Sequence, residues 1–156
     1  MNSKPIEGVQ VIPITRHSDD RGYFSEVFRD SWLKDKRIKK RSDGYQLSYT
    51  EAYPKVIKSF HMHKLQFDYW FVVKGNIQIG LVDLRRASRP TQTIFIGEDN
   101  PQGVLIPPSV AHGYKVLGEK SAGLFYLTSK EYNAKKPDEY RYDWNEFGYD
   151  WETKNR

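Results

Sequence analysis

Short runs of alternating hydrophobic and polar residues, rich in β-branched and aromatic side chains, recur along the whole chain of 156 residues. Turn-forming segments such as Asp19–Gly22 and Asp99–Pro101 separate these runs. The pattern predicts many short β-strands in a sandwich or barrel, with helix only at about residues 30–40 and in the terminal region. The predicted strands are Val9–Ile14, Tyr23–Phe28, Tyr45–Tyr49, Val56–Phe60, Tyr69–Val73, Asn76–Asp83, Gln92–Ile96, Gly103–Ile106, Gly113–Leu117 and Gly123–Thr128.

A tight turn separates the predicted strands Tyr69–Val73 and Asn76–Asp83, which indicates a β-hairpin. The first of these strands begins just after Asp68, and the strand before it ends at His61. We therefore expect the segment between His61 and Asp68 to lie at the mouth of the barrel, where ligand pockets form.

The length is typical of one domain, covering residues 1–156. The sequence has no cysteine, which excludes disulfides, thiol catalysis and cysteine metal ligands. No apolar run approaches the roughly 18 residues that a membrane span needs, and the first residues lack the apolar stretch of a signal peptide. A soluble, cytoplasmic protein without a membrane partner is expected.

The net charge of +5 favours anionic partners, but much of the excess lies in the basic run at residues 34–41. No helix-turn-helix or RNA-binding signature accompanies that run, so a nucleic-acid partner is not predicted. A phosphorylated small molecule explains the charge equally well.

Three of the four histidines fall at the ends of predicted strands. His61 and His63 form an H-x-H pair followed by Asp68 and Gly75, and His112 follows a Pro-x-Ser segment on a later strand. Residues two apart on a strand project to the same side, so the pair can share one pocket with the acid. The spacing resembles the two motifs of the cupin superfamily, which implies an all-β jelly-roll barrel, here with short peripheral helices.

Three interpretations of these side chains stay open. They could be metal ligands for zinc, iron, manganese or nickel, with His61, His63, Asp68 and His112 as the set. Without a metal, they could form an acid and base set around a substrate. They could also be buried groups whose hydrogen bonds serve only the structure.

Further segments occur in the order and rough spacing of the dTDP-4-dehydrorhamnose 3,5-epimerase family, which the chain resembles over about residues 8 to 151. The resemblance implies a metal-free jelly roll without a cofactor, usually a homodimer, that acts on a nucleotide-linked 4-keto-6-deoxysugar. The segments that carry the resemblance are Asp20–Glu26, Val82–Arg85, Ile106–Tyr114, Phe125–Tyr132 and Tyr142–Asn145.

The same resemblance implies residue roles. His61 matches the base that removes a proton next to the ketone, Tyr126 matches the acid that returns it, and His112 matches a pocket residue near the substrate. We expect Tyr126 to lie opposite His112 on a neighbouring strand. In the nucleotide-binding element, a guanidinium holds phosphate and an aromatic ring stacks on the base. The predicted substrate-binding residues are Arg21, Phe24, Glu26, Gln46, Lys58, His112 and Tyr132.

Several family positions carry other residues in this sequence. Lys58 stands where the family has arginine, Asp68 where it has its active-site lysine, and Ile79 where it has an acid. The carboxylate that pairs with the base histidine comes from a C-terminal segment of the family that has no match here. Such losses should each cost orders of magnitude in rate unless other groups compensate.

The string Phe60–Lys64 resembles the F-H-x-H-K element of the sugar-nucleotide 3,4-ketoisomerases, which implies that His63 takes part in moving the proton. A carboxylate at Asp68 near His61 and His63 would raise their basicity. The sequence therefore predicts a sugar-nucleotide epimerase or isomerase of deoxysugar or surface-polysaccharide synthesis, with His61, His63, Asp68 and Tyr126 as catalytic residues. A metal-binding cupin and a non-catalytic sugar-nucleotide-binding protein are the alternatives.

Overall fold

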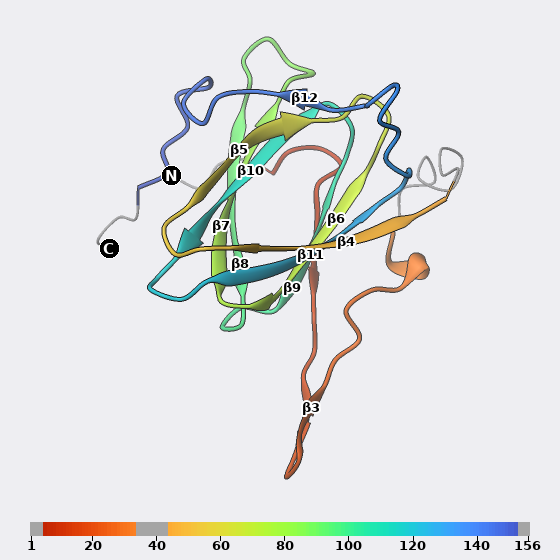
Figure 1. Cartoon of the computed structure of the whole chain (residues 1–156), viewed down its shortest axis with the longest axis vertical. Helices are drawn as coiled ribbons and strands as arrows, with labels where there is room; N and C mark the ends of the chain where they lie inside the picture. Colours follow the sequence, from red (N-terminus) through yellow and green to blue (C-terminus); the bar gives the residue numbers. More distant parts are fainter. Residues whose placement is uncertain (1–4, 34–43, 153–156) are drawn as a thin grey trace.

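Two antiparallel sheets face each other and form a β-barrel in the computed structural model, which describes residues 5–33 and 44–152 (Figure 1). We name the sheets after a central strand of each. The β6 sheet has the order β1 (Gln10–Pro13), β9 (Gln102–Ile106), β6 (Asp68–Lys74), β11 (Ala122–Thr128), β4 (Gln46–Ala52). The β7 sheet has the order β12 (Tyr140–Arg141), β5 (Ile57–Met62), β10 (Val110–Leu117), β7 (Asn76–Asp83), β8 (Thr91–Gly97). A separate two-stranded hairpin, β2 (His17–Asp19) and β3 (Gly22–Phe24), extends away from the barrel.

The hydrophobic core lies between the two sheets because alternate residues of each strand point inward. Ile77, Ile79 and Leu81 of β7 have no exposed surface and pack with Trp70 and Val104 of the facing sheet. Ile77, Ile79 and Leu81 thus form the face of β7 that contributes to this core.

The outer faces of both sheets carry a second layer of packing. Tyr69 and Leu105 of the β6 sheet pack against Leu33 from the segment after the hairpin. On the outer face of the β7 sheet, Tyr149 and Trp151 of the C-terminal segment belong to a hydrophobic cluster. These layers bury large aromatic residues on both sides of the barrel and fix its shape.

The predicted jelly-roll fold is confirmed, and each predicted strand overlaps an observed one. The strand predicted at Tyr23–Phe28 is wrong beyond residue 24, and the short exposed strands β2 and β12 were not predicted. The predicted peripheral helices are wrong as far as the structure describes the chain, which holds one 3₁₀ turn at Asp30–Trp32. Residues 34–40 of the predicted helix lie outside the described residues. Within the described ranges, no helix has the length and apolar character to cross a membrane.

The predicted hairpin between β6 and β7 is wrong, because the two strands belong to different sheets. β6 pairs with β9 and β11, whereas β7 pairs with β8 and β10. Gly75 has a φ of 68°, and a Cβ atom there would lie 2.5 Å from the Ser121 carbonyl oxygen. The glycine thus lets the chain cross from one sheet to the other in a tight turn.

The Val82–Arg85 segment, which the family resemblance picked out, makes a structural ion pair. Asp83 is 1% exposed, and Arg85 donates to both of its carboxylate oxygens at 2.7 and 2.9 Å. Arg85 also donates to the Glu7 carbonyl oxygen at 2.8 Å, which ties the N-terminal segment to the barrel. The hydrogen bonds from Arg85 hold the pKa of Asp83 below its ordinary value.

Arg85→Met is expected to lower the free energy of unfolding by about 2–3 kcal/mol at pH 7, because it leaves a buried carboxylate without its bidentate partner. Chemical denaturation of both proteins measures the difference. Ionised Asp83 stabilises the fold above its ordinary pKa, and that contribution is lost as the pH falls through the lower pKa of the folded state. The difference between the two proteins should therefore shrink under acid conditions.

Arg86→Met is the matched control, since Arg86 is 62% exposed and lies 3.9 Å from the same carboxylate. It should change the free energy of unfolding by less than about 0.5 kcal/mol. Equal destabilisation by the two variants would contradict a specific contribution from Arg85.

Candidate active site

A cavity of about 1110 Å³ lies between the two sheets, beside the segment from His61 to Asp68. Strands of both sheets and residues 130–141 contribute to its wall. The predicted position of residues 61–68 at the mouth of the barrel is confirmed. The predicted site residues that line this cavity are Gln46, Lys58, His61, His63, Asp68, Tyr126 and Tyr132.

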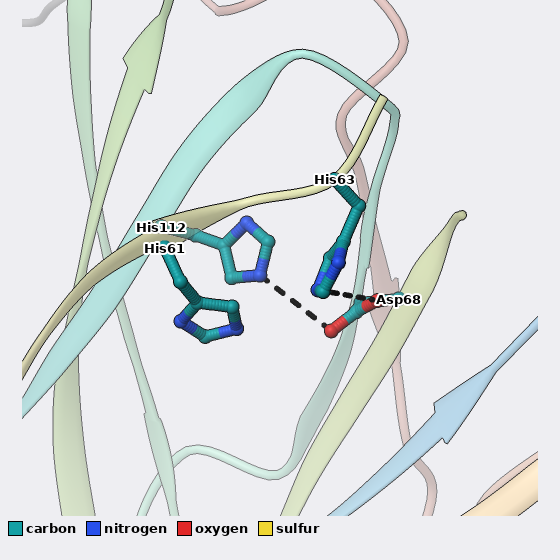
Figure 2. A group of neighbouring side chains, drawn as sticks. All are labelled: His61, His63, Asp68 and His112. Atoms are coloured by element: carbon teal, nitrogen blue, oxygen red, sulfur yellow. Dashed lines mark ion pairs between the residues drawn. The ribbon is translucent and has the colours of Figure 1, made fainter. Parts of the chain in front are cut away.

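The three histidines of the two motifs converge on Asp68, as Figure 2 shows. His61 on β5 and His112 on β10 are register partners within the β7 sheet, and their ring centroids lie 4.2 Å apart. His63 follows the end of β5, whereas Asp68 is the first residue of β6 in the facing sheet. One potential ligand atom from each of the four residues lies within 4.8 Å of the others.

The Asp68 carboxylate is 2% exposed and faces two of the imidazoles. Its two oxygens lie 3.7 Å from Nε2 of His63 and 3.5 Å from Nε2 of His112. Burial raises the pKa of Asp68, but the surrounding imidazoles, His112 first, outweigh that effect, so that the pKa is lowered and the group is ionised. The expected approach to His63 is present, but among the described residues no ion pair joins Asp68 to His61.

Side chains and backbone carbonyls hold this arrangement in place. Gln66 donates to one Asp68 oxygen at 2.8 Å, and the Trp70 indole donates to the other at 3.2 Å. Nδ1 of His112 lies 2.9 Å from the Val110 carbonyl oxygen, and Nδ1 of His63 is hydrogen-bonded to a backbone carbonyl of the segment 130–141. Because a carbonyl only accepts, Nδ1 carries the hydrogen in both rings, which directs Nε2 toward Asp68.

His61 lines the cavity, and its ring lies against that of His112. Burial, and then the neighbouring His112, lowers the pKa of His61 to about 3. The imidazole is therefore neutral at physiological pH.

Tyr126 reaches the cavity from β11, on the opposite sheet. The expectation that it lies on a strand next to His112 is wrong, because its register partners are Trp70 and Ser48. His61 and Tyr126 therefore approach the same space from opposite walls of the barrel, an arrangement suited to proton transfer on two faces of one carbon.

The predicted nucleotide-binding element lies apart from the cavity of its own chain. Arg21 and Phe24 belong to the β2–β3 hairpin, which projects from the barrel (Figure 1). Arg21 pairs with Asp19, Glu26 pairs with Arg29, and Phe24 is 65% exposed. Among the described residues that line the cavity, none comes from this element.

Asp138 is a site residue that the sequence did not reveal. Its carboxylate accepts hydrogen bonds from the backbone N–H groups of Lys64, Leu65 and Gln66 at 2.9, 2.8 and 3.0 Å, and its carbonyl oxygen bonds Nδ1 of His63. It therefore fixes the segment that carries His63. No local pattern signals this function, because the partners lie more than 70 positions away along the chain.

Comparisons with known proteins find relatives along nearly the whole chain. The family model for dTDP-4-dehydrorhamnose 3,5-epimerase matches residues 3–156. The chain is 43% identical to the spore coat polysaccharide biosynthesis protein SpsL of Bacillus subtilis, over 97% of this chain and 99% of that protein. It is 34% identical to the probable low-salt glycan biosynthesis epimerase Agl13 of Haloferax volcanii, over 94% of each chain.

Solved structures of such epimerases have a similar fold. The crystal structure of dTDP-4-dehydrorhamnose 3,5-epimerase from Elizabethkingia anophelis superposes with a TM-score of 0.76 at 21% identity, covering 97% of this chain and 85% of that one. The match over nearly the whole sequence, together with the barrel and its histidine-lined cavity, confirms the resemblance seen in the motifs. The chain belongs to the dTDP-4-dehydrorhamnose 3,5-epimerase family.

Proposed function

We propose that this protein epimerises a nucleotide-linked 4-keto-6-deoxysugar in the synthesis of a surface polysaccharide. Family membership and the names of two relatives, a spore coat polysaccharide biosynthesis protein and a probable glycan biosynthesis epimerase, support this assignment. A cytoplasmic location is part of this proposal.

The observation that carries the proposal is the placement of His61 and Tyr126 on opposite walls of one cavity. Inverting a carbon next to a ketone requires a base on one face and a proton donor on the other. His61 removes the proton from that carbon, an enolate forms, and Tyr126 returns a proton to the opposite face. The volume of about 1110 Å³ is ample for a sugar and its diphosphate.

Cationic and polar groups on the wall of the cavity support the substrate. Lys58 lies on β5 where the family has arginine and lines the same cavity as His61, so its ammonium group can supply positive charge to the substrate. The Gln46 side chain accepts a hydrogen bond from the Tyr132 backbone N–H at 2.9 Å, which holds the loop after β11 over the cavity. These residues are proposed to bind the sugar and phosphate groups.

The nucleotide-binding element is proposed to act on a second subunit. Arg21 and Phe24 are exposed on a hairpin that extends away from the barrel, with no ligand site beside them among the described residues (Figure 1). In a homodimer, such a hairpin can reach the partner's cavity and supply the guanidinium and the aromatic ring that nucleotide binding needs.

Solvent exchange at the sugar carbons tests the catalytic assignment. With dTDP-4-keto-6-deoxyglucose in deuterated water, the wild-type protein should incorporate deuterium at carbon 3, carbon 5 or both. His61→Asn should lower that rate by at least about 100-fold, because the base is lost. Tyr126→Phe should retain exchange but slow inversion by about 100-fold, because the proton can return only from the side on which it left. Mass spectrometry and NMR of the trapped products measure both.

The exposed phenol of Tyr53, which is 78% exposed, offers a matched control. Tyr53→Phe should leave exchange and inversion within about twofold of the wild type. A wild-type protein that exchanges no sugar proton with thymidine, uridine or guanosine diphosphate ketosugars would show that the assignment is wrong. Movement of the keto group to carbon 3 would indicate ketoisomerisation in place of epimerisation.

Mixed dimers test whether the hairpin of one subunit completes the cavity of its partner. Arg21→Ala and His61→Asn should each be inactive alone, but a mixed dimer contains one cavity with an intact His61 and an intact hairpin from the partner. Random mixing should therefore restore about a quarter of the wild-type activity, since half of the dimers are mixed and each has one complete site. Sedimentation should give twice the mass of the chain. A mixture that stays inactive, or a monomer with full nucleotide affinity, would contradict the proposal.

A further inference from the structure

We propose that Trp70 is a positioning residue for the base, through which the Asp68 carboxylate acts on His61. The proposal rests on the proposed epimerisation, in which His61 removes a proton from the sugar and so gains a positive charge. It assigns to the indole a function beyond its packing in the core between the sheets.

The contacts of Trp70 are the first observation. Trp70 is 3% exposed and lines the cavity from β6, in the sheet opposite His61. Its ring stacks on the His61 imidazole, with the two planes 27° apart and the ring centroids 6.1 Å apart. Its N–H donates to an Asp68 oxygen at 3.2 Å. The indole therefore contacts the base with its ring and the buried carboxylate with its nitrogen.

Both contacts favour a positively charged imidazole. The face of an aromatic ring is negative, and it attracts a cation that lies within about 6 Å of the ring centroid. The separation of 6.1 Å is at that limit. The hydrogen bond from the indole N–H to an ionised carboxylate polarises the ring and makes its face more negative. The contacts thus stabilise the charged base more than the neutral one, which is what lowers a barrier.

The base has no closer carboxylate partner in the part of the chain that the structure describes. The C-terminal acid that pairs with this histidine in the family has no match in the sequence, and Asp68 forms no ion pair with His61. A nitrogen of His61 and an oxygen of Asp68 lie within 4.8 Å, so the carboxylate also acts through space. Trp70 adds a direct contact that transmits the same charge to the imidazole.

Two rings of β10 hold the indole in this orientation. His112 and Tyr114 lie 5.1 and 5.8 Å from Trp70, with interplanar angles of 82° and 88°. Edge-to-face contacts of this kind favour one relative orientation of the rings. The indole is therefore in place before the proton moves and needs no rearrangement when the charge on His61 appears.

A double-mutant cycle measures the coupling. Deuterium exchange into dTDP-4-keto-6-deoxyglucose is compared for the wild type, Trp70→Phe, Asp68→Asn and the double variant. Trp70→Phe should lower kcat about 10-fold and leave KM within about threefold, because the contact stabilises the protonated base and not the bound sugar. Asp68→Asn should slow Trp70→Phe by a factor at least about three times smaller than the factor by which it slows the wild type. Equal factors, or a change in KM alone, would overturn the proposal.

Fluorinated tryptophan keeps the test decisive if Trp70→Phe does not fold. Singly, doubly and triply fluorinated indoles keep their shape and N–H, but their faces are progressively less negative. Their incorporation should lower kcat by about two- to threefold for each fluorine. Trp32, Trp144 and Trp151 are not among the described residues that line the cavity. Trp144→Phe is the matched control, since Trp144 is 53% exposed, and it should keep both the wild-type rate and its dependence on fluorination. A rate that does not change with fluorination contradicts the positioning role.

NMR without substrate separates a failure of this proposal from a failure of the proposed epimerisation. The indole N–H signal of Trp70 should move upfield in Asp68→Asn, because its hydrogen bond loses a charged acceptor. The ring-proton signals of His61 should shift in Trp70→Phe, because the stacked indole is lost. Signals that stay in place would refute the contacts even if the sugar exchanges its protons. The expected shifts in a protein that exchanges no sugar proton would instead refute the epimerase assignment.

Discussion

The site depends on one buried carboxylate between two sheets. Asp68 begins β6, yet its oxygens face His63 and His112 from the opposite side of the barrel. An ionised carboxylate that is 2% exposed is costly unless every oxygen has a favourable partner. Gln66 and Trp70 supply hydrogen bonds to it from its own sheet and the adjoining loop. The residue that faces His63 and His112 is therefore the same one that distinguishes this chain from the lysine-containing family pattern.

The segment at residues 130–141 couples this centre to the cavity wall. Asp138 bonds three backbone N–H groups that follow His63, and the same segment lines the cavity. A carboxylate that accepts several backbone hydrogen bonds holds a loop more firmly than packing alone. The wall that surrounds a substrate and the support that orients His63 are thus one structure, so the two cannot move independently.

Local patterns allowed much of the fold to be predicted from the sequence. The strand at residues 76–83 was predicted with both ends correct, because apolar residues alternate at Ile77, Ile79 and Leu81 and a turn glycine precedes it. The sequence did not reveal that β6 and β7 belong to different sheets. A short turn at a glycine can form a hairpin or connect two sheets, and the local pattern is the same in both cases. The motif spacing predicted that His61, His63, Asp68 and His112 lie close together. The contacts of Asp138 and the position of Tyr126 on the opposite wall of the cavity were not predictable, because they depend on contacts between distant parts of the chain.

The negative charge of Asp68 constrains the reaction that the cavity can carry out. A lysine at position 68 would place a cation beside a developing enolate, whereas Asp68 places an anion there. An anion repels negative charge on the substrate oxygen, so the substitution disfavours the reaction unless a cation returns. Lys58 supplies one on the cavity wall, at the position of the family's arginine. The replacement of lysine by aspartate therefore makes the reaction depend on cationic side chains of the cavity wall, such as Lys58.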